Sequence, residues 1–406
     1  MSLIDVVGGV YDEVCLVPSW QALYGSGGRA ASAIRSLGGA ARLNTCFPAE
    51  SREDIERLAI ENGITIGSVF DGPRIRFEYL YSLRAETTTP PLSSITAVRL
   101  TTISLEDALV FGMLEATVPV TARRAVYDPQ AGYRATPHAL DEIAAEQLVL
   151  VCNLSEARGI TNQFELPDVV EVLIEDRRLV AAIIKLGPIG ALVVQRNGPV
   201  QRVPSVRTKH VFPIGSGDVF SGAFSHAWLQ LGYEPEAAAK FASFSTARYC
   251  RYGALSALNE RLAGRSSRLK ASTGIQSSQR KTIYLAGPFF NLAQRWFIEE
   301  ALGALTGLGL KVFSPLHDVG TGKSDKLTAK ADLAGLEASD AVFAWVDDMD
   351  PGTIFEIGYA RDRNIPVVMY GSNVRRRDLV MFVGSGVKVF DHFASALYAT
   401  YWAANG

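Results

Sequence analysis

Residues 341–370 read AVFAWVDDMDPGTIFEIGYARDRNIPVVMY, and this stretch decides the fold of the C-terminal part of the chain. It holds an apolar run, an Asp-rich loop, a helical pattern and a second apolar run that starts at Ile365. Two buried strands joined through a helix predict a parallel pair with the helix packed on the sheet. Because ligands of such sheets bind where strands end, we expect the chemistry near Asp347, Asp348 and Asp350.

The same alternation extends outward in both directions. Around this stretch, the C-terminal part has strand candidates at 282–287 and 310–315 and a helical pattern at Gln294–Leu308. The N-terminal part has buried-strand candidates at 3–7, 148–154, 180–187 and 191–195, and helical spacing at Ala30–Leu37 and Glu234–Tyr249. This alternation predicts parallel sheets with helices on both faces.

The chain divides into two parts. Its 406 residues, 48% of them hydrophobic, are too many for one ordinary domain and apolar enough to fill two cores. Residues 259–281 are basic and Ser-rich with few large apolar side chains, which is typical of a linker, although a nucleic-acid contact is the alternative. We predict an α/β domain at 1–258 and a smaller, doubly wound (flavodoxin/Rossmann-like) parallel-sheet domain at 282–406.

Composition excludes several classes of protein. The chain carries 40 Lys and Arg against 42 Asp and Glu, which argues against a general nucleic-acid binder. Its four Cys form no CxxC pair or Cys/His cluster, so we expect no disulfide scaffold and no metal site. The most apolar stretch, 179–194, is too short and too broken by Gly and Pro to cross a membrane. A cytoplasmic protein is expected.

Residues 215–224, GSGDVFSGAF, predict a loop that enters a helix. The free N–H groups and the dipole of a helix N-terminus bind anions, and glycine lets a phosphate approach the main chain. Asp218 in that turn would repel a phosphate unless it acts as a base on an incoming hydroxyl, as a sugar kinase requires. The alternative is a Gly-rich turn in which Asp218 caps the helix.

Other pieces of the first half follow in a consistent order. They are Val6–Gly9 with Asp12, Gly25–Gly28, Asp128–Gln130, Asn153 with Glu156, and Leu186–Gly190. With GSGDVFSGAF, this order resembles the ribokinase/PfkB carbohydrate kinase family over nearly the whole first half. The resemblance implies a ribokinase-like domain that transfers the γ-phosphate of ATP to a sugar or nucleoside hydroxyl. Asp218 would be the catalytic base, and Gly215, Ser216 and Gly217 would form the anion hole.

The resemblance implies further roles. Asp12 would hold substrate hydroxyls, and Asn153 and Glu156 would act near magnesium and phosphate, so ATP and Mg²⁺ are the implied cofactors. Arg29 stands where the family has a substrate-binding Asn, and Phe212 begins the place of its usual Asp-Thr pair. Two interpretations stay open: an active kinase, or a domain that binds a nucleoside or nucleotide with weak or no turnover.

The second half of the chain contains three candidate catalytic acids, Asp332, Asp350 and Glu356. Glu356 is expected at a helix N-terminus, which stabilises an anion and suits a nucleophile. Asp350 lies on the loop before it, and Asp332 is expected at an earlier helix start. Carboxylates that converge on one pocket are what N-glycoside chemistry needs: one attacks the anomeric carbon and another handles the leaving group's proton. The alternative is that these acids cap helices and solvate loops.

The pattern resembles the nucleoside 2-deoxyribosyltransferase family over about 125 residues, from TIYLAGPFF at 282–290 through Asp332 to DPGTIFEIGYA at 350–360. The resemblance implies Glu356 as nucleophile, Asp332 as the group that handles the base's proton and Asp350 as the group that orients the sugar. Tyr284 would tune Glu356. No cofactor is implied.

The same resemblance implies that Gly287, Pro288 and Phe289 shape the pocket and stack on the base, and that Asp318 reaches the base edge. Nucleotide-hydrolysing relatives have Ser or Arg beside this turn, so the apolar turn favours nucleosides over nucleotides. Family members form homo-oligomers, and the aromatic end from residue 398 would either complete a neighbour's site or pack into its own domain.

Together the halves predict a bifunctional enzyme of nucleoside metabolism whose partners are small nucleosides, nucleobases or nucleotides. The C-terminal part would cleave or exchange an N-glycosidic bond, with a second base or water as acceptor. The N-terminal part would phosphorylate a nucleoside or sugar, or would act as a nucleotide sensor that regulates the other part.

Overall fold

The computed structural model describes residues 2–131, 135–196, 198–259, 270–271, 280–320 and 324–406. The chain forms two compact units: unit 1, Met1–Thr208 with Phe212–Ser272, and unit 2, Lys209–Val211 with Thr273–Gly406. Both are built from strands and helices, so the predicted α/β class is confirmed. Within the predicted linker 259–281, residues 260–269 and 272–279 lie outside the described residues.

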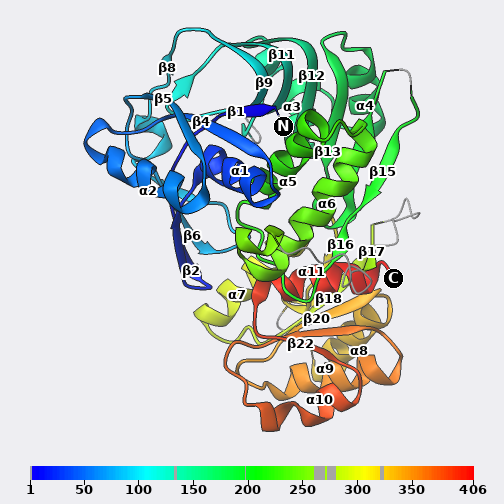
Figure 1. The fold of residues 1–406 in the computed structure, drawn as a ribbon. Coiled ribbons are helices and arrows are strands. Elements are labelled where there is room, and N and C mark those ends of the chain that lie inside the picture. Colours follow the sequence, from blue (N-terminus) through cyan, green and yellow to red (C-terminus); the bar gives the residue numbers. More distant parts are fainter. Residues whose placement is uncertain (1, 132–134, 197, 260–269, 272–279, 321–323) are drawn as a thin grey trace. The chain divides into compact units, whose positions relative to one another are not determined.

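Unit 1 is built on a nine-stranded sheet (Figure 1). Its strands are, in spatial order, β15 (Gln201–Pro204), β14 (Gly190–Val194), β13 (Leu179–Lys185), β12 (Ile143–Asn153), β11 (Val120–Asp128), β9 (Ile103–Phe111), β1 (Leu3–Val7), β4 (Ala40–Cys46) and β5 (Thr65–Phe70). Neighbours are parallel except β13–β14 and β14–β15, which corrects the prediction of a purely parallel sheet. The connection between β13 and β14, with Gly187 at φ 57° and Gly190 at φ 116°, is too short for a crossover and returns the chain antiparallel.

Helices cover both faces of this sheet. On one face lie α1 (Gly25–Ser36), α2 (Arg52–Asn62), α5 (Ser216–Ser225) and α6 (Pro235–Tyr252), and on the other α3 (Leu154–Thr161) and α4 (Leu166–Glu175). Strand β12 serves both cores: Val149 and Val151 face the first, and Leu148 and Leu150 face the second. Successive side chains of a strand point to opposite faces, which explains the continuous apolar run.

A smaller sheet in unit 1 carries one predicted acid, Asp12. Its strands are, in order, β3 (Trp20–Leu23), β2 (Asp12–Val17), β6 (Arg76–Tyr81) and β7 (Thr87–Thr89). Two short ladders complete the described strands of unit 1: β8 (Val98–Arg99) with β10 (Ala116–Thr117), and β16 (Val206–Arg207) with β17 (Lys270–Ala271). Cys15 of β2 packs with Phe212, Val219 and Tyr249. This apolar cluster joins the small sheet to α5 and α6.

Unit 2 is a five-stranded, fully parallel sheet in the order β19 (Lys311–Phe313), β18 (Thr282–Ala286), β20 (Ala341–Trp345), β21 (Val367–Tyr370) and β22 (Lys388–Phe390). Its helices are α7 (Leu292–Gly307), α8 (Asp325–Glu337), α9 (Pro351–Asp362), α10 (Val380–Gly384) and α11 (Phe393–Ala404). The chain passes from β18 to one neighbour, β19, and later to the other, β20. That change of direction opens a crevice at the carboxyl ends of β18 and β20.

The helices of unit 2 lie on both faces of its sheet. Leu336 of α8 and Ile357 of α9 belong to one core, and Phe297 of α7 and Phe393 of α11 contact each other on the other face. The aromatic end of the chain forms α11, which packs on β20 and β21 of its own unit, and Tyr401 in this helix is 3% exposed. None of the described helices is long and apolar enough to span a membrane.

Candidate active site

Tyr284 and Glu356 meet at the crevice of unit 2. Tyr284 is a buried residue of β18, and its hydroxyl donates a 2.6 Å hydrogen bond to Glu356 Oε1. Glu356 comes from α9, which follows the neighbouring strand β20. The sequence predicted this pairing, and the structure brings the two groups into direct contact.

Asp350 sets the start of α9. Its Oδ2 accepts hydrogen bonds from Thr353 N at 2.8 Å and from Thr353 Oγ1 at 2.9 Å, so Asp350 is the N-cap and Pro351 the first helical residue. Glu356 is consequently the sixth residue of the helix rather than its first. The expectation that the helix N-terminus stabilises Glu356 as an anion is wrong, because that effect fades beyond the first turn.

The environment of Glu356 favours its protonated form. Burial raises the pKa of Glu356 to about 7, and the nearby charges of Asp332 and Asp350 act in the same direction. The hydrogen bond from Tyr284 opposes them and lowers this pKa. Asp332 lies in the interior of α8 rather than at a helix start, yet it is near enough to influence both Glu356 and Tyr284. The four predicted groups therefore share one site.

The loop after β18 carries the predicted pocket residues. A β-carbon at Gly287 would lie 3.0 Å from Ile298 Cδ1, so any larger residue there would force the Ile298 side chain of α7 to shift. Pro288 is buried, and Phe289 is half-buried with its ring 5.4 Å from that of Phe290. The side chains that follow β18 are apolar, as expected for a surface that stacks on a base.

Asp318 follows β19, the strand beside β18. It lies in the helical turn Pro315–Val319, is exposed, and accepts a 2.8 Å hydrogen bond from Ser314 N through Oδ2. In this structure the carboxylate therefore caps its own turn. Contact with a base edge stays a prediction.

Arg29 is the centre of a buried charge cluster in unit 1. Its Nη1 donates to Asp218 Oδ2 at 2.9 Å and to Glu13 Oε1 at 3.0 Å, and its Nη2 donates to Glu13 Oε2. Gln130 Nε2 donates to the other oxygen of Asp218 at 3.3 Å. The Arg29 side chain is 1% exposed and that of Asp218 11%. Both oxygens of Asp218 are thus bound by the chain itself.

Burial raises the pKa of Asp218 to about 6. Arg29 lowers this pKa, while Glu13 and Asp128 raise it. Glu13 and Asp218 therefore share one cation, Arg29, in a site that is shielded from solvent.

The structure places Asp12 away from this cluster. Asp12 accepts from Arg74 Nε at 2.6 Å and from Arg74 Nη2 at 3.0 Å, in a half-exposed pair. Neighbouring residues of a strand point to opposite faces, so Glu13 and not Asp12 shares the buried face with Cys15. Sequence reasoning missed Glu13, although this alternation in β2 was the signal that would have found it.

The GSG turn forms a loop into a helix, as predicted. Gly215 is the N-cap of α5 at φ 71°, so Asp218 lies in the first turn and is not the cap. A β-carbon at Gly217 would lie 3.6 Å from Lys185 Nζ, which places an ammonium beside the turn. Lys185 pairs with Asp128 at 2.6 Å. A cation beside a helix N-terminus attracts anions.

Asn153 and Glu156 form a capping box at the start of α3. Asn153 Oδ1 accepts from Glu156 N at 2.9 Å, and Glu156 Oε2 accepts from Asn153 N at 2.8 Å. In the described parts of the chain, no group of three or more His, Cys, Asp or Glu residues is arranged to hold a metal ion. Magnesium that accompanies a nucleotide is held mainly by the phosphates and by water, so a role of Asn153 and Glu156 beside it stays a prediction, and we derive no step through the metal.

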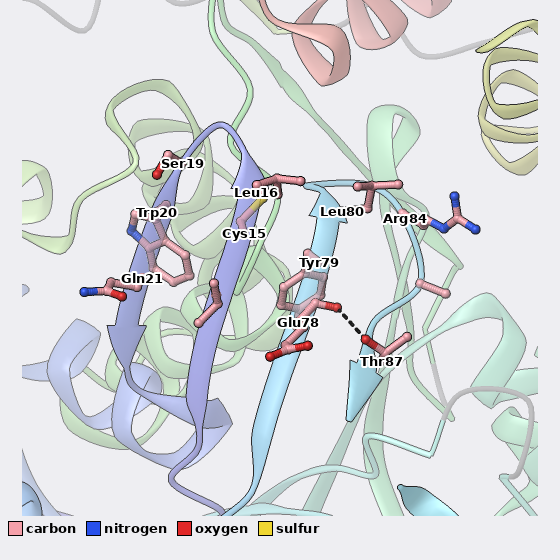
Figure 2. Close-up of a pocket in the computed structure, with 12 residues that line it drawn as sticks. Cys15, Leu16, Ser19, Trp20, Gln21, Glu78, Tyr79, Leu80, Arg84 and Thr87 are labelled. Carbon is pink, nitrogen blue, oxygen red and sulfur yellow. Dashed lines mark hydrogen bonds between the residues drawn. The ribbon is translucent and has the colours of Figure 1, made fainter. Parts of the chain in front are cut away.

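The small sheet of unit 1 bears a hollow of about 680 Å³ (Figure 2). Trp20 of β3, Cys15 of β2 and Tyr79 of β6 line it, and Thr87 Oγ1 donates to Glu78 O at its edge, at 3.4 Å. Within the described chain, its lining includes none of the predicted site residues. The predicted phosphate site and this hollow are therefore different features.

Two family models match the chain, one mainly within unit 1 and the other within unit 2. Residues 95–259 match the pfkB family carbohydrate kinases, and residues 283–394 match the nucleoside 2-deoxyribosyltransferases. The predicted resemblance to both families is confirmed. Both are enzyme families, so the two parts indicate kinase-like and deoxyribosyltransferase-like functions in nucleoside metabolism. The first match leaves out Asp12 and Arg29, and the second includes every predicted site residue of unit 2.

Solved structures similar to this chain are kinases of low sequence identity. The nucleoside kinase of Methanocaldococcus jannaschii, an archaeal member of the ribokinase family, is 16% identical with a TM-score of 0.49, over 63% of this chain and 94% of its own. A Vibrio cholerae O395 fructokinase, bound to fructose, ADP and calcium, is 17% identical with a TM-score of 0.49, over 64% and 97%. The Burkholderia thailandensis nucleoside kinase bound to inosine is 17% identical with a TM-score of 0.45, over 62% and 92%. No curated protein matches the chain by sequence.

Proposed function

We propose that unit 2 cleaves or exchanges the N-glycosidic bond of 2′-deoxynucleosides, with Glu356 as the nucleophile. The observation that carries this proposal is the hydrogen bond from Tyr284 to Glu356 at 2.6 Å. It holds one carboxylate oxygen in place at the crevice between β18 and β20, with Asp332 and Asp350 nearby. Glycosyl transfer needs a nucleophilic carboxylate and a second acid, and here a half-buried carboxylate is held in place beside two other acids.

The first half-reaction forms a covalent ester. Ionised Glu356 attacks C1′ of the sugar while the C1′–N bond breaks, through an oxocarbenium-like transition state. The electron pair of that bond goes to the base, and Asp332 passes a proton to that base as the general acid. Asp350 orients the sugar hydroxyls, and Phe289 stacks on the base.

The second half-reaction releases Glu356. A nitrogen of another base, or water, attacks C1′ and gives its proton to Asp332, and the ester bond to Glu356 breaks. A base as acceptor makes the enzyme a transferase, and water makes it a hydrolase. The apolar loop from Gly287 to Phe289 contains no cation for a 5′-phosphate, which supports nucleosides rather than nucleotides as substrates.

The test is chromatography of the purified protein with each deoxynucleoside, with and without a second free base. A new nucleoside that forms only with added base identifies transfer, and free base without an acceptor identifies hydrolysis. Glu356→Ala should abolish both while thermal unfolding shows an intact fold. If that variant keeps more than about a tenth of the wild-type rate, the covalent mechanism is wrong.

For unit 1 we propose a second function, which is binding of a nucleoside or nucleotide without phosphoryl transfer. The supporting observation is the ion pair between Arg29 and Asp218. A base that activates a hydroxyl must have an oxygen within hydrogen-bond reach of that hydroxyl. Here Arg29 and Gln130 bind both oxygens of Asp218. The GSG turn can still bind an anion, because it starts α5 and has the Lys185 ammonium beside it.

Calorimetric titration with ATP, together with assays of ADP release in the presence of nucleosides or sugars, tests this function. We expect ATP binding without release of ADP, for the wild type and for Asp218→Asn alike. Turnover that Asp218→Asn abolishes would establish a kinase instead.

A further inference from the structure

Gln294 connects two loops of the candidate active site in unit 2. It is 9% exposed in the first turn of α7, and its Oε1 accepts from Phe290 N at 2.8 Å and from Asn291 N at 3.2 Å. Its Nε2 donates to Asp348 Oδ2 at 2.8 Å. One amide group thus joins the loop after β18 to the loop after β20.

The loop after β20 is also fixed from its other side. Asp347 accepts hydrogen bonds from three groups, namely Trp345 Nε1 at 3.0 Å, Ser372 Oγ at 2.8 Å and Asn373 N at 2.9 Å. Two adjacent carboxylates therefore hold this loop: Asp347 is hydrogen-bonded to the loop after β21, and Asp348 is hydrogen-bonded to Gln294 of α7.

The hydrogen bonds of Asp347 and Asp348 flank a residue with an unfavourable backbone conformation, Met349. Met349 has φ 47°, in the left-handed region that side chains other than glycine rarely adopt. The next residue, Asp350, is the N-cap that starts α9 and thereby places Glu356. Strained positions persist where surrounding contacts over-determine them. Both neighbours of Met349 are held in this way, Asp348 by Gln294 and Asp350 by Thr353.

We propose that Gln294 is a positioning residue for glycosyl transfer. Its amide holds the loop at 346–350 in register with the loop that carries Phe289, and so keeps Asp350 and Glu356 aligned. This inference rests on the function proposed for unit 2. Nothing in it requires Gln294 to contact the substrate.

Gln294→Glu separates the two hydrogen-bonding roles of this side chain. A carboxylate still accepts from the N–H groups of Phe290 and Asn291, so the start of α7 is kept. It cannot donate to Asp348, and the two negative charges repel each other. We expect kcat to fall by about 10- to 100-fold, as for small misplacements of catalytic groups, while KM changes much less.

The double variant Gln294→Glu with Asp348→Asn tests the pair directly. It reverses donor and acceptor, so the hydrogen bond between the loops can form again. We expect kcat to return to within a few-fold of the wild-type value. Ala293→Glu is the matched control, because it adds the same charge at an exposed position of the same turn, and its kcat should stay near the wild-type value.

Hydrogen exchange of peptides that cover 346–354 supplies a readout independent of activity. Faster exchange in Gln294→Glu, restored in the double variant, supports the proposal. Wild-type kcat in Gln294→Glu, or no recovery in the double variant, overturns it. A wild-type protein without N-glycoside activity would refute the proposed function and the catalytic role of Gln294 together, whereas unchanged exchange would refute only the tie between the loops.

Discussion

At the residue scale, Glu356 has to be ionised in surroundings that favour the protonated acid. Its low exposure and two neighbouring acids raise its pKa to about 7, so only part of the enzyme carries the nucleophile at neutral pH. Tyr284 is the group that favours ionisation, because its hydroxyl donates to the carboxylate. The same hydrogen bond fixes the direction of attack.

The pH profile of glycosyl transfer tests this balance. Activity should fall as the pH drops through about 7, because protonated Glu356 cannot attack C1′. Tyr284→Phe removes a hydrogen bond that lowers this pKa, so the acidic limb of kcat/KM should move to higher pH. A profile of kcat/KM against pH for both proteins measures the shift. An unmoved or lowered limb in Tyr284→Phe would contradict the role given to Tyr284.

In unit 1, Arg29→Met removes the only cation that the described structure pairs with Glu13 and Asp218. Two buried carboxylates are then left near each other without a partner, and we expect a loss of about 3–5 kcal/mol of unfolding free energy. Denaturant unfolding at pH 8, above the pKa of about 6 for Asp218, measures it. Arg74→Met is the matched control: Arg74 also bridges two acids but is 42% exposed, so its loss should be about 1 kcal/mol or less. Equal losses would show that burial does not decide the effect.

At the element scale, α9 connects local sequence to chemistry. Asp350 caps the helix, Pro351 occupies its first position, and the second turn brings Glu356 to Tyr284. A shift of the helix start by one residue would rotate Glu356 by about 100° around the axis, away from β18. The cap is therefore a condition for the site as well as for the helix.

Two substitutions at Asp350 separate capping from catalysis. Asp350→Ala should lower the unfolding free energy by about 1 kcal/mol and abolish most activity, because the cap and the carboxylate are both lost. Asp350→Ser keeps a capping oxygen, so stability should stay near the wild-type value while activity is still lost. Thermal unfolding and kcat are measured together. Full activity in Asp350→Ser would show that Asp350 acts only as the cap.

At the scale of the whole molecule, the two units carry separate hydrophobic cores. Residues of α1, α5 and α6 share one core with strands of unit 1, whereas α8 and α9 share theirs with β18 and β20. Each unit therefore has its own source of stability, and the proposed functions give each unit its own ligand. A ligand stabilises the unit that binds it by mass action.

Calorimetric scans of the full chain should show two unfolding transitions that respond to different ligands. We expect ATP to raise the midpoint of one transition and a deoxynucleoside to raise that of the other. Glu356→Gln identifies the transition of unit 2, because it replaces an ionisable, half-buried group in that unit alone. If both ligands move the same transition, the assignment of one ligand to each unit is wrong.

Local patterns in the sequence determined much of this protein. Strand and helix periodicity placed β1, β18 and β20, and the predicted α/β class holds for both units. The acids Asp332, Asp350 and Glu356 were found as a group because their order along the chain resembles that of the nucleoside 2-deoxyribosyltransferases, whose family model matches residues 283–394. These features follow from contacts near in sequence.

Only the tertiary structure decided which charges meet. Arg29 and Asp218 are 189 residues apart, and their ion pair depends on the packing of α1 against α5. The choice of Glu13 over Asp12 and the tie of Gln294 to Asp348 depend likewise on which face and which loop become neighbours. The raised pKa of Glu356 arises from burial, which is a property of the packed unit. Long-range packing sets the dielectric surroundings and the partner of each charge, and local sequence carries no record of either.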